Sequence, residues 1–216
     1  MVFVLAGNWQ RGRMHDRAAL GAQFEAARGS APVALPLDLG DRVGWRYRTV
    51  EAAGRYDAER QILLDNRVHG GRAGYHVVTP LVTGDGRAVL VNRGFIKAGA
   101  TRAALPEAPP PAGEVRIRGR LNQPPSAYLE LGATAPERGV WQNLDLARFT
   151  AATGLAVLPL IIEQVGGPAD GLVRDWPRPD AGSDRNRIYM MQWYAFAGLA
   201  AGLWSWQTVR ARRLRR

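Results

Sequence analysis

The side chains that could bind a metal ion or act as nucleophiles are few and widely spaced. The three histidines, His15, His69 and His76, show no local metal-binding spacing such as two histidines four residues apart on a helix. None of the serines lies in a Gly-x-Ser-x-Gly elbow, and no P-loop lysine follows the glycines of 70–74. We therefore expect a protein that is not an enzyme and has no metal site of its own.

The amino-acid composition excludes further classes of protein. The chain has 216 residues, of which 46% are hydrophobic, which is enough for a folded core and argues against disorder. It has no cysteine, which excludes disulfides, cysteine-based zinc or copper sites and covalent c-type haem attachment. The formal net charge is +10, but five arginines lie within residues 210–216. Because half of the excess charge is this tail, we expect no nucleic-acid partner.

Residues 188–209 contain no formally charged side chain and would extend about 33 Å as a helix. Tyrosines and tryptophans lie toward both ends of this segment, as in helices that cross a bilayer. We therefore predict a transmembrane helix at 188–209, with a buried core helix as the alternative. The basic tail at 210–216 would then be cytoplasmic, and residues 30–187 would form a periplasmic domain.

The start of the chain offers only a short apolar run, from Val2 to Ala6. Five residues cannot span a membrane, so we interpret residues 1–8 as the end of a truncated first transmembrane helix. A tail-anchored protein with its domain in the cytoplasm is the alternative. Residues 9–29 carry spaced apolar side chains before Gly29 and predict an amphipathic helix that leaves the membrane.

The region between the two ends is rich in short β-type segments. Glycine and proline supply 25 and 14 residues, which favours many turns over a helical bundle. Thr83-Gly84-Asp85-Gly86 predicts a tight hairpin, and the proline-rich segment 101–113 predicts an extended connection. A short helix is expected at 146–153. Strands are expected at 47–56, 61–65, 75–81, 87–92, 115–121 and 158–164.

Several short strings in a fixed order resemble the surfeit locus protein 1 family of cytochrome c oxidase assembly factors. They extend over nearly the whole chain, and the second and third are specific in combination. The strings are Gly7-Asn8-Trp9-Gln10, Leu64-Asp65-Asn66-Arg67 followed by Gly74-Tyr75 and Val78-Thr79-Pro80-Leu81, Val89 to Phe95, Gly119-Arg120-Leu121, Trp141 to Asp145, Trp176-Pro177, and Tyr189 with Gln192-Trp193-Tyr194.

The resemblance implies a role in placing haem a into the catalytic subunit of a haem-copper oxidase. It implies a β-rich α+β outer domain, antiparallel and barrel-like, flanked by two transmembrane helices. The location would be the cell inner membrane, with the main domain periplasmic, or the mitochondrial inner membrane in a eukaryote. The oxidase catalytic subunit, haem a synthase and membrane lipid are the expected partners.

One position departs from the family. Similar members carry a haem-associated histidine directly before the second predicted membrane helix, where this chain has Asn186. An amide is not a haem-iron ligand, whereas a neutral imidazole is. Three alternatives stay open: another ligand, haem held by packing and propionate contacts alone, or a scaffold that stabilises the oxidase subunit without binding haem. The candidate haem contacts are His15, Met190, Trp9, Arg13, Arg187 and Trp193.

Arg67 and Arg93 each follow an asparagine at the end of a predicted strand. Two related strands that end in the same dipeptide suggest matched positions near a shared edge. We interpret both arginines as structural, with a binding role as the alternative.

Overall fold

The computed structural model describes residues 1–36, 42–101, 104–124, 139–179 and 183–214. The chain divides into two compact units, which are described separately below. The helical unit comprises Met1–Glu25 and Pro177–Arg216, and the barrel unit comprises Ala26–Trp176.

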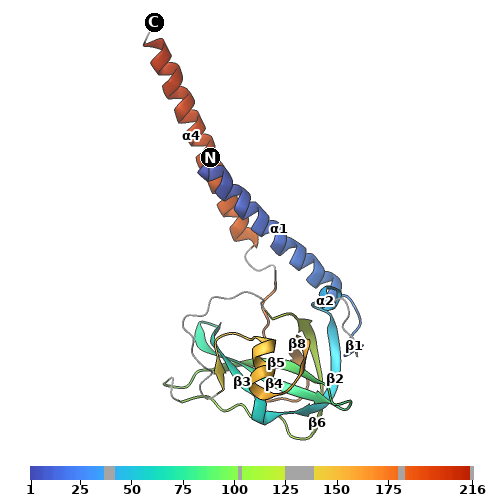
Figure 1. Cartoon of the computed structure of the whole chain (residues 1–216). Coiled ribbons are helices and arrows are strands. Elements are labelled where there is room, and N and C mark those ends of the chain that lie inside the picture. Colours follow the sequence, from blue (N-terminus) through green and yellow to red (C-terminus); the bar gives the residue numbers. More distant parts are fainter. Residues whose placement is uncertain (37–41, 102–103, 125–138, 180–182, 215–216) are drawn as a thin grey trace. The chain divides into compact units, whose positions relative to one another are not determined.

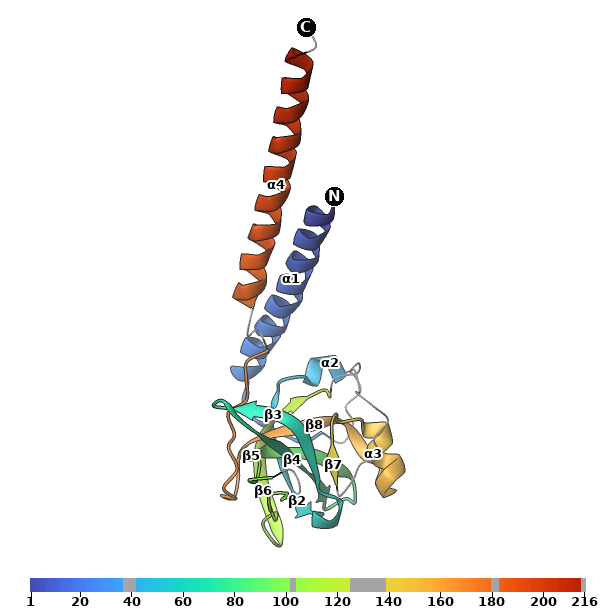
Figure 2. The ribbon, with the colours of Figure 1, turned by 90° about the vertical axis from the view of Figure 1, so that its left-hand side faces the viewer.

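The helical unit consists mainly of two long helices, α1 (Val2–Arg28) and α4 (Ser183–Arg213), which lie side by side (Figures 1 and 2). Phe3 stacks on Trp193 with ring centroids 6.0 Å apart, whereas Glu25, near the other end of α1, pairs with Arg178 ahead of α4. Contacts that run in opposite order along the two segments make the pair antiparallel. Residues 1–8 and 9–29, expected as separate parts, thus belong to one continuous helix that ends at Arg28.

Buried and half-buried side chains on the two helices follow a regular spacing of three and four residues, typical of helices that pack along a seam. On α4 the positions are Asn186, Met190, Trp193 and Ala197. On α1 they are Gly7, Gln10, Met14, Arg17, Gly21 and Phe24.

No helix in the described ranges has both the length and the apolar character needed to cross a membrane. The predicted transmembrane helices at 188–209 and 1–8 are therefore wrong. The physical reason at 188–209 is that an uncharged segment need not be strongly apolar. Gln192, Gln207 and a set of tyrosines and tryptophans bring polar groups into it and lower its mean hydropathy.

The barrel unit is built from eight strands and short helices. The strands are β1 (Val33–Ala34), β2 (Thr49–Tyr56), β3 (Ile62–His69), β4 (Arg72–Thr83), β5 (Ala88–Lys97), β6 (Glu114–Asn122), β7 (Val140–Trp141) and β8 (Val157–Gly166). The helices are α2 (Arg42–Trp45), the 3₁₀ turn η1 (Ala58–Arg60) and α3 (Leu146–Thr153).

The strands form one sheet in the order β1-β2-β6-β8-β5-β4-β3-β7, and an additional pairing of β2 with β4 closes part of it into a barrel. Most neighbours are antiparallel, but β1–β2, β3–β7 and β5–β8 are parallel. The expected all-antiparallel sheet is therefore wrong in these pairs. The segment between β5 and β8 contains β6 and α3, so it is long enough for the crossover that a parallel pair needs.

Two apolar clusters fix the barrel. One lies between β2, β4, β5, β6 and β8 and includes Val50, Leu81, Val91 and Ile162. Another joins β3, β4, β5 and β8 to α3, which Figure 2 shows beside β7 on the outside of the barrel; Phe149 of α3 is fully buried in this cluster. Because both clusters cover β5, most of its side chains are buried on both faces.

The turn between β4 and β5 has the geometry that its sequence predicts. The join between β4 and β5 turns at Gly86, which has a φ of 83° that favours glycine. The Gly86 N–H donates to the Thr83 carbonyl, and the Thr83 hydroxyl donates to Asp85 Oδ1 at 2.5 Å. The predicted hairpin is confirmed.

Candidate functional site

Arg93, in the middle of β5, is a fully buried cation in the barrel unit. Its Nε and Nη2 donate to Asp170 Oδ2 at 3.1 and 2.9 Å, and its Nη1 donates to Gln61 Oε1 at 2.9 Å. Nη1 and Nη2 also donate to the carbonyls of Ala108 and Pro109. A guanidinium has five N–H donors, and these five hydrogen bonds satisfy all of them within the protein. This is what a structural role requires.

Arg67, on β3, has a different environment. Its one hydrogen bond among the described residues is a long one, 3.4 Å from Nη1 to the carbonyl of Asn66. A β-bulge between Leu64 and Arg67 contains Asn66 at a φ of 58°, and Arg93 lies at a register shift of its own, between Asn92, which pairs with Val78, and Gly94, which pairs with Val77. The contacts of Arg93 support its structural interpretation, whereas the structural interpretation of Arg67 stays a prediction.

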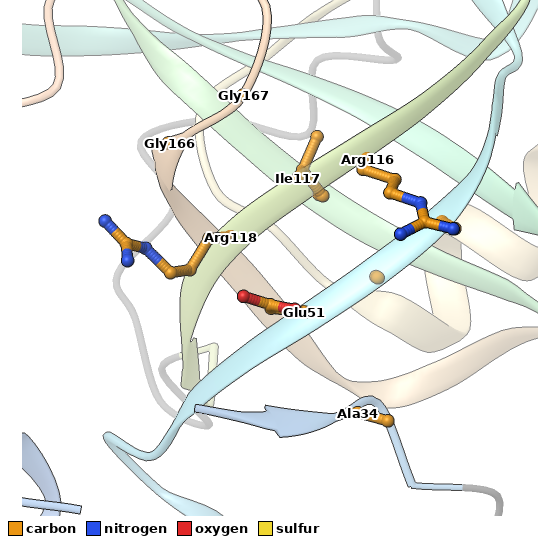
Figure 3. A pocket seen from close by; sticks show the side chains of 9 residues that line it. Ala34, Glu51, Arg116, Ile117, Arg118, Gly166 and Gly167 are labelled. Carbon is orange, nitrogen blue, oxygen red and sulfur yellow. The ribbon is translucent and has the colours of Figure 1, made fainter. Parts of the chain in front are cut away.

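A groove of about 500 Å³ lies beside β1, β2, β6 and the end of β8 (Figure 3). Arg116 and Arg118 of β6 and Glu51 of β2 are its charged lining residues, and all three are exposed. Exposed guanidinium groups are well solvated and need no ligand to be stable. The arginines of this groove are explained by the alternation of β6, which places them on the solvent-exposed face and Ile117 in the core.

Three of the predicted haem contacts, Asn186, Met190 and Trp193, lie on the α4 side of the helical seam. The Nδ2 atom of Asn186 is buried and has no hydrogen-bond partner in the described part of the chain. An unpaired buried donor costs about 1–3 kcal/mol, so the asparagine does not stabilise the helix pair at this position.

The other predicted contacts have exposed side chains. On α1, the Arg13 guanidinium lies over the Trp9 ring at 5.7 Å, in a cation–π contact. His15 is also exposed, but the helical repeat of about 100° per residue turns it roughly 160° away from Arg13. Arg187 lies 3.5 Å from Asp184 on the surface of α4. The structure therefore does not gather these side chains into one cluster.

The register of the two helices nevertheless places His15 near the predicted haem position. The Tyr194 hydroxyl donates to Asn8 Oδ1 at 2.7 Å. In an antiparallel pair, seven residues forward on α1 and seven back on α4 lead from this contact to His15 and Arg187. His15 thus lies at the level of Arg187 and its neighbour Asn186, although their side chains make no described contact.

A comparison with known protein families identifies the family of the chain. A model of the SURF1 family matches residues 1–198, which is most of the chain. The chain belongs to the SURF1 family. Membership of this family implies a role in cytochrome c oxidase assembly.

Individual SURF1 relatives match across most of both sequences. Surfeit locus protein 1 of Mus musculus is 26% identical, with 94% of this chain and 71% of the relative aligned. Surfeit locus protein 1 of Homo sapiens is also 26% identical, with 92% and 71% aligned. A SURF1-like protein of Monosiga brevicollis is 26% identical, with 92% and 80% aligned.

Two features of this SURF1 family member could not be recognised from the sequence. They are the partners of the buried Arg93 and a polar cavity in the barrel unit. Asp170 and Gln61 lie far from Arg93 in the sequence and belong to no recognisable motif. The cavity is lined by residues from the strings around Arg67, Asn92 and Asn143. The recurrence of asparagine and arginine within these strings was the available signal.

Proposed function

We propose that this protein assists the delivery of haem a to the catalytic subunit of a haem-copper oxidase, as an assembly factor without catalytic activity of its own. Family membership supports the assembly role. The observation that carries the haem part is the register of α1 and α4, which sets His15 at the level of Asn186 and Arg187. An imidazole on α1 at this axial level supports the proposal, because the resemblance associates the same level of α4 with a haem-holding histidine.

In this proposal haem a is cargo, and the side chains divide the work of holding it. His15 supplies the lone pair of a neutral imidazole to the haem iron, because the amide of Asn186 cannot. Arg187, on α4 at the same level, pairs with a propionate carboxylate through its guanidinium. Met190 and Trp193 line the seam next to this level and contribute apolar packing.

The oxidase catalytic subunit is the proposed receiver of haem a, and haem a synthase is the proposed source. The location stays a prediction: the cell inner membrane with the barrel unit periplasmic, or the mitochondrial inner membrane in a eukaryote.

The alternative is a scaffold that stabilises the oxidase subunit without binding haem. The exposed apolar side chains of α4 favour it, since Leu199, Leu203 and Trp204 are each more than half exposed. A contiguous apolar surface of this kind is typical of a protein–protein contact.

A haem a titration of the full chain, read at the Soret band, separates the two functions. We expect saturable binding and at least a tenfold weaker affinity for His15→Ala. His69→Ala is the matched control, because His69 lies at the end of β3 in the barrel unit. Equal affinity for all three proteins would contradict the role of His15. Co-purification with the oxidase subunit but no haem binding would favour the scaffold.

A further inference from the structure

The barrel unit contains a polar cavity of about 450 Å³ that the proposed haem function does not use. Its polar lining includes Arg67 from β3, His76 from β4, Asn92 from β5 and Asn143 from the segment before α3. Leu64, Leu144 and Ile161 add an apolar wall. The volume lies in the range of small-molecule sites, about 300–1,000 Å³.

Asn92 is an unsatisfied buried amide in this cavity. Asn92 is only 5% exposed, and its Nδ2 atom lies 3.2 Å from Nδ1 of His76. Its Oδ1 atom is buried and has no hydrogen-bond donor among the described residues. An orphaned buried acceptor costs about 1–3 kcal/mol, and bulk water does not reach it. A hydroxyl or N–H group of a molecule bound in the cavity would supply the missing donor.

His76 does not supply that donor in the assigned geometry, and a flip of the Asn92 amide would leave its Nδ2 atom without a partner among the described residues instead. Burial lowers the pKa of its imidazole to about 4, with smaller contributions from the positive charges of Arg67 and His69. The ring is therefore neutral at pH 7 and carries one N–H. Nδ1 accepts from the amide of Asn92 in the assigned geometry, which leaves the N–H on Nε2.

The cavity also has guanidinium groups without a carboxylate partner. Arg67 is half-buried, and neither Arg67 nor Arg46 forms an ion pair with any described residue. Burial lowers the pKa of Arg67 and Asp65 raises it, yet a guanidinium stays charged at pH 7.

The one carboxylate in the lining, Glu163, does not neutralise these arginines. It accepts from Arg120 at 2.8 and 2.5 Å and from Asn122 Nδ2 at 2.8 Å. Its charge is thus compensated by Arg120, and the cavity keeps an excess of positive charge.

We propose that this cavity binds a small oxyanion, a carboxylate or a phosphate, that also carries an O–H or N–H donor. Arg67 holds the oxyanion, with Arg46 as the second cation at the rim. The donor of the ligand satisfies Oδ1 of Asn92, and the apolar wall covers the remainder of the molecule. This site lies within the barrel unit and does not depend on haem a.

The test is an isothermal titration of the full chain with gluconate, hexanoate and inorganic phosphate. Gluconate and hexanoate share a six-carbon carboxylate, but only gluconate has hydroxyl donors. We expect gluconate to bind at least tenfold more tightly than hexanoate. Phosphate binding with no gluconate binding would assign the site to the phosphate form of the same ligand class.

Two variants connect the binding to the cavity. Arg67→Gln should weaken binding of the preferred anion at least tenfold, whereas Arg116→Gln, which removes an exposed arginine from β6, should leave it unchanged. Addition of the anion should also shift the imidazole NMR signals of His76, a readout that needs no substitution. The proposal would be overturned if neither gluconate nor phosphate bound. It would also be overturned if gluconate and hexanoate bound equally well, or if both variants lost binding to the same extent.

Discussion

At the scale of single residues, Arg93 and Arg67 follow asparagines in the same way, yet the fold uses them differently. Arg93 is fully buried, and each of its donors meets an acceptor. Arg67 is half-buried and faces a cavity instead. The sequence shows the shared dipeptide, but the partners of Arg93 that separate the two roles, Asp170 and Gln61, come together only through tertiary packing.

Replacement of Arg93 should be strongly destabilising. Arg93→Ala leaves the carboxylate of Asp170, whose side chain is 3% exposed, with Arg174 as its remaining ion-pair partner. Breaking a buried pair by removing one partner costs about 3–5 kcal/mol. Urea unfolding followed by tryptophan fluorescence measures the loss. The exposed control Arg116→Ala should change stability by less than about 0.5 kcal/mol, and an equally small effect of Arg93→Ala would refute a structural role.

His76 should make folding stability sensitive to mild acid. The pKa of this imidazole is about 4 in the folded protein and 6.5 ordinarily, because burial disfavours its charged form. The unfolded chain therefore takes up a proton first as the pH falls below 6.5. The stability contribution is complete above pH 6.5 and is lost, at up to about 1.4 kcal/mol per pH unit, toward pH 4.

The measurement is the free energy of unfolding of the wild-type chain and His76→Gln between pH 7.5 and 4. The difference between their slopes isolates His76 from the carboxylates that also titrate near pH 4. Parallel curves over this range would show that the imidazole is not shielded from water.

At the scale of elements, local patterns predicted much of the barrel unit. The helix at 146–153, the hairpin at 83–86 and the alternating strand β6 are all present in the structure. These elements depend on caps, turn glycines and side-chain alternation, which a sequence shows directly. The parallel pairing of β5 with β8 was not predicted, because neighbours in a sheet are chosen by long-range packing.

The helical seam gives a physical reason for the glycine in the string Gly7-Asn8-Trp9-Gln10. Gly7 is buried, and a Cβ atom there would lie 2.6 Å from the ring of Tyr194. Gly7 thus permits the close approach that also forms the hydrogen bond from Tyr194 to Asn8. The preference for glycine becomes visible only when the partner helix is known.

Gly7→Ala should therefore separate α1 from α4 although alanine favours helix formation by about 1 kcal/mol. Cysteines introduced as Phe3→Cys and Phe196→Cys report the pairing, because the chain has none of its own and these rings lie 6.0 Å apart. We expect a lower cross-linking yield with Gly7→Ala. Gly12→Ala is the control, since a Cβ atom at Gly12 would have no neighbour within 4 Å in the described part of the chain, and equal yields would contradict the packing role of Gly7.

At the scale of the whole molecule, the division into two units predicts that the barrel unit folds by itself. It contains the two apolar clusters described above, a third one around Tyr75 and Val77, and the Arg93–Asp170 ion pair. A fragment of residues 26–176 should therefore unfold in one cooperative transition, monitored by near-ultraviolet circular dichroism. A fragment without fixed tertiary signals would show that the helices are needed to complete its core.

In the proposed function, haem a is bound by the helical unit, while the barrel unit is a separate compact unit. The predicted iron ligand is His15, at the level where Asn186 replaces the histidine of similar family members. If the two positions face the same haem, an imidazole on either helix should suffice. The chain can therefore be tested by moving the ligand from α1 to α4.

The most direct measurement is a haem a titration of His15→Ala and of the double variant His15→Ala with Asn186→His, compared with the wild-type chain at the Soret band. We expect His15→Ala to bind haem a at least tenfold more weakly and Asn186→His to restore a ligated-haem spectrum in the double variant. Unchanged binding by His15→Ala, or no recovery in a double variant that still folds, would contradict haem ligation by His15.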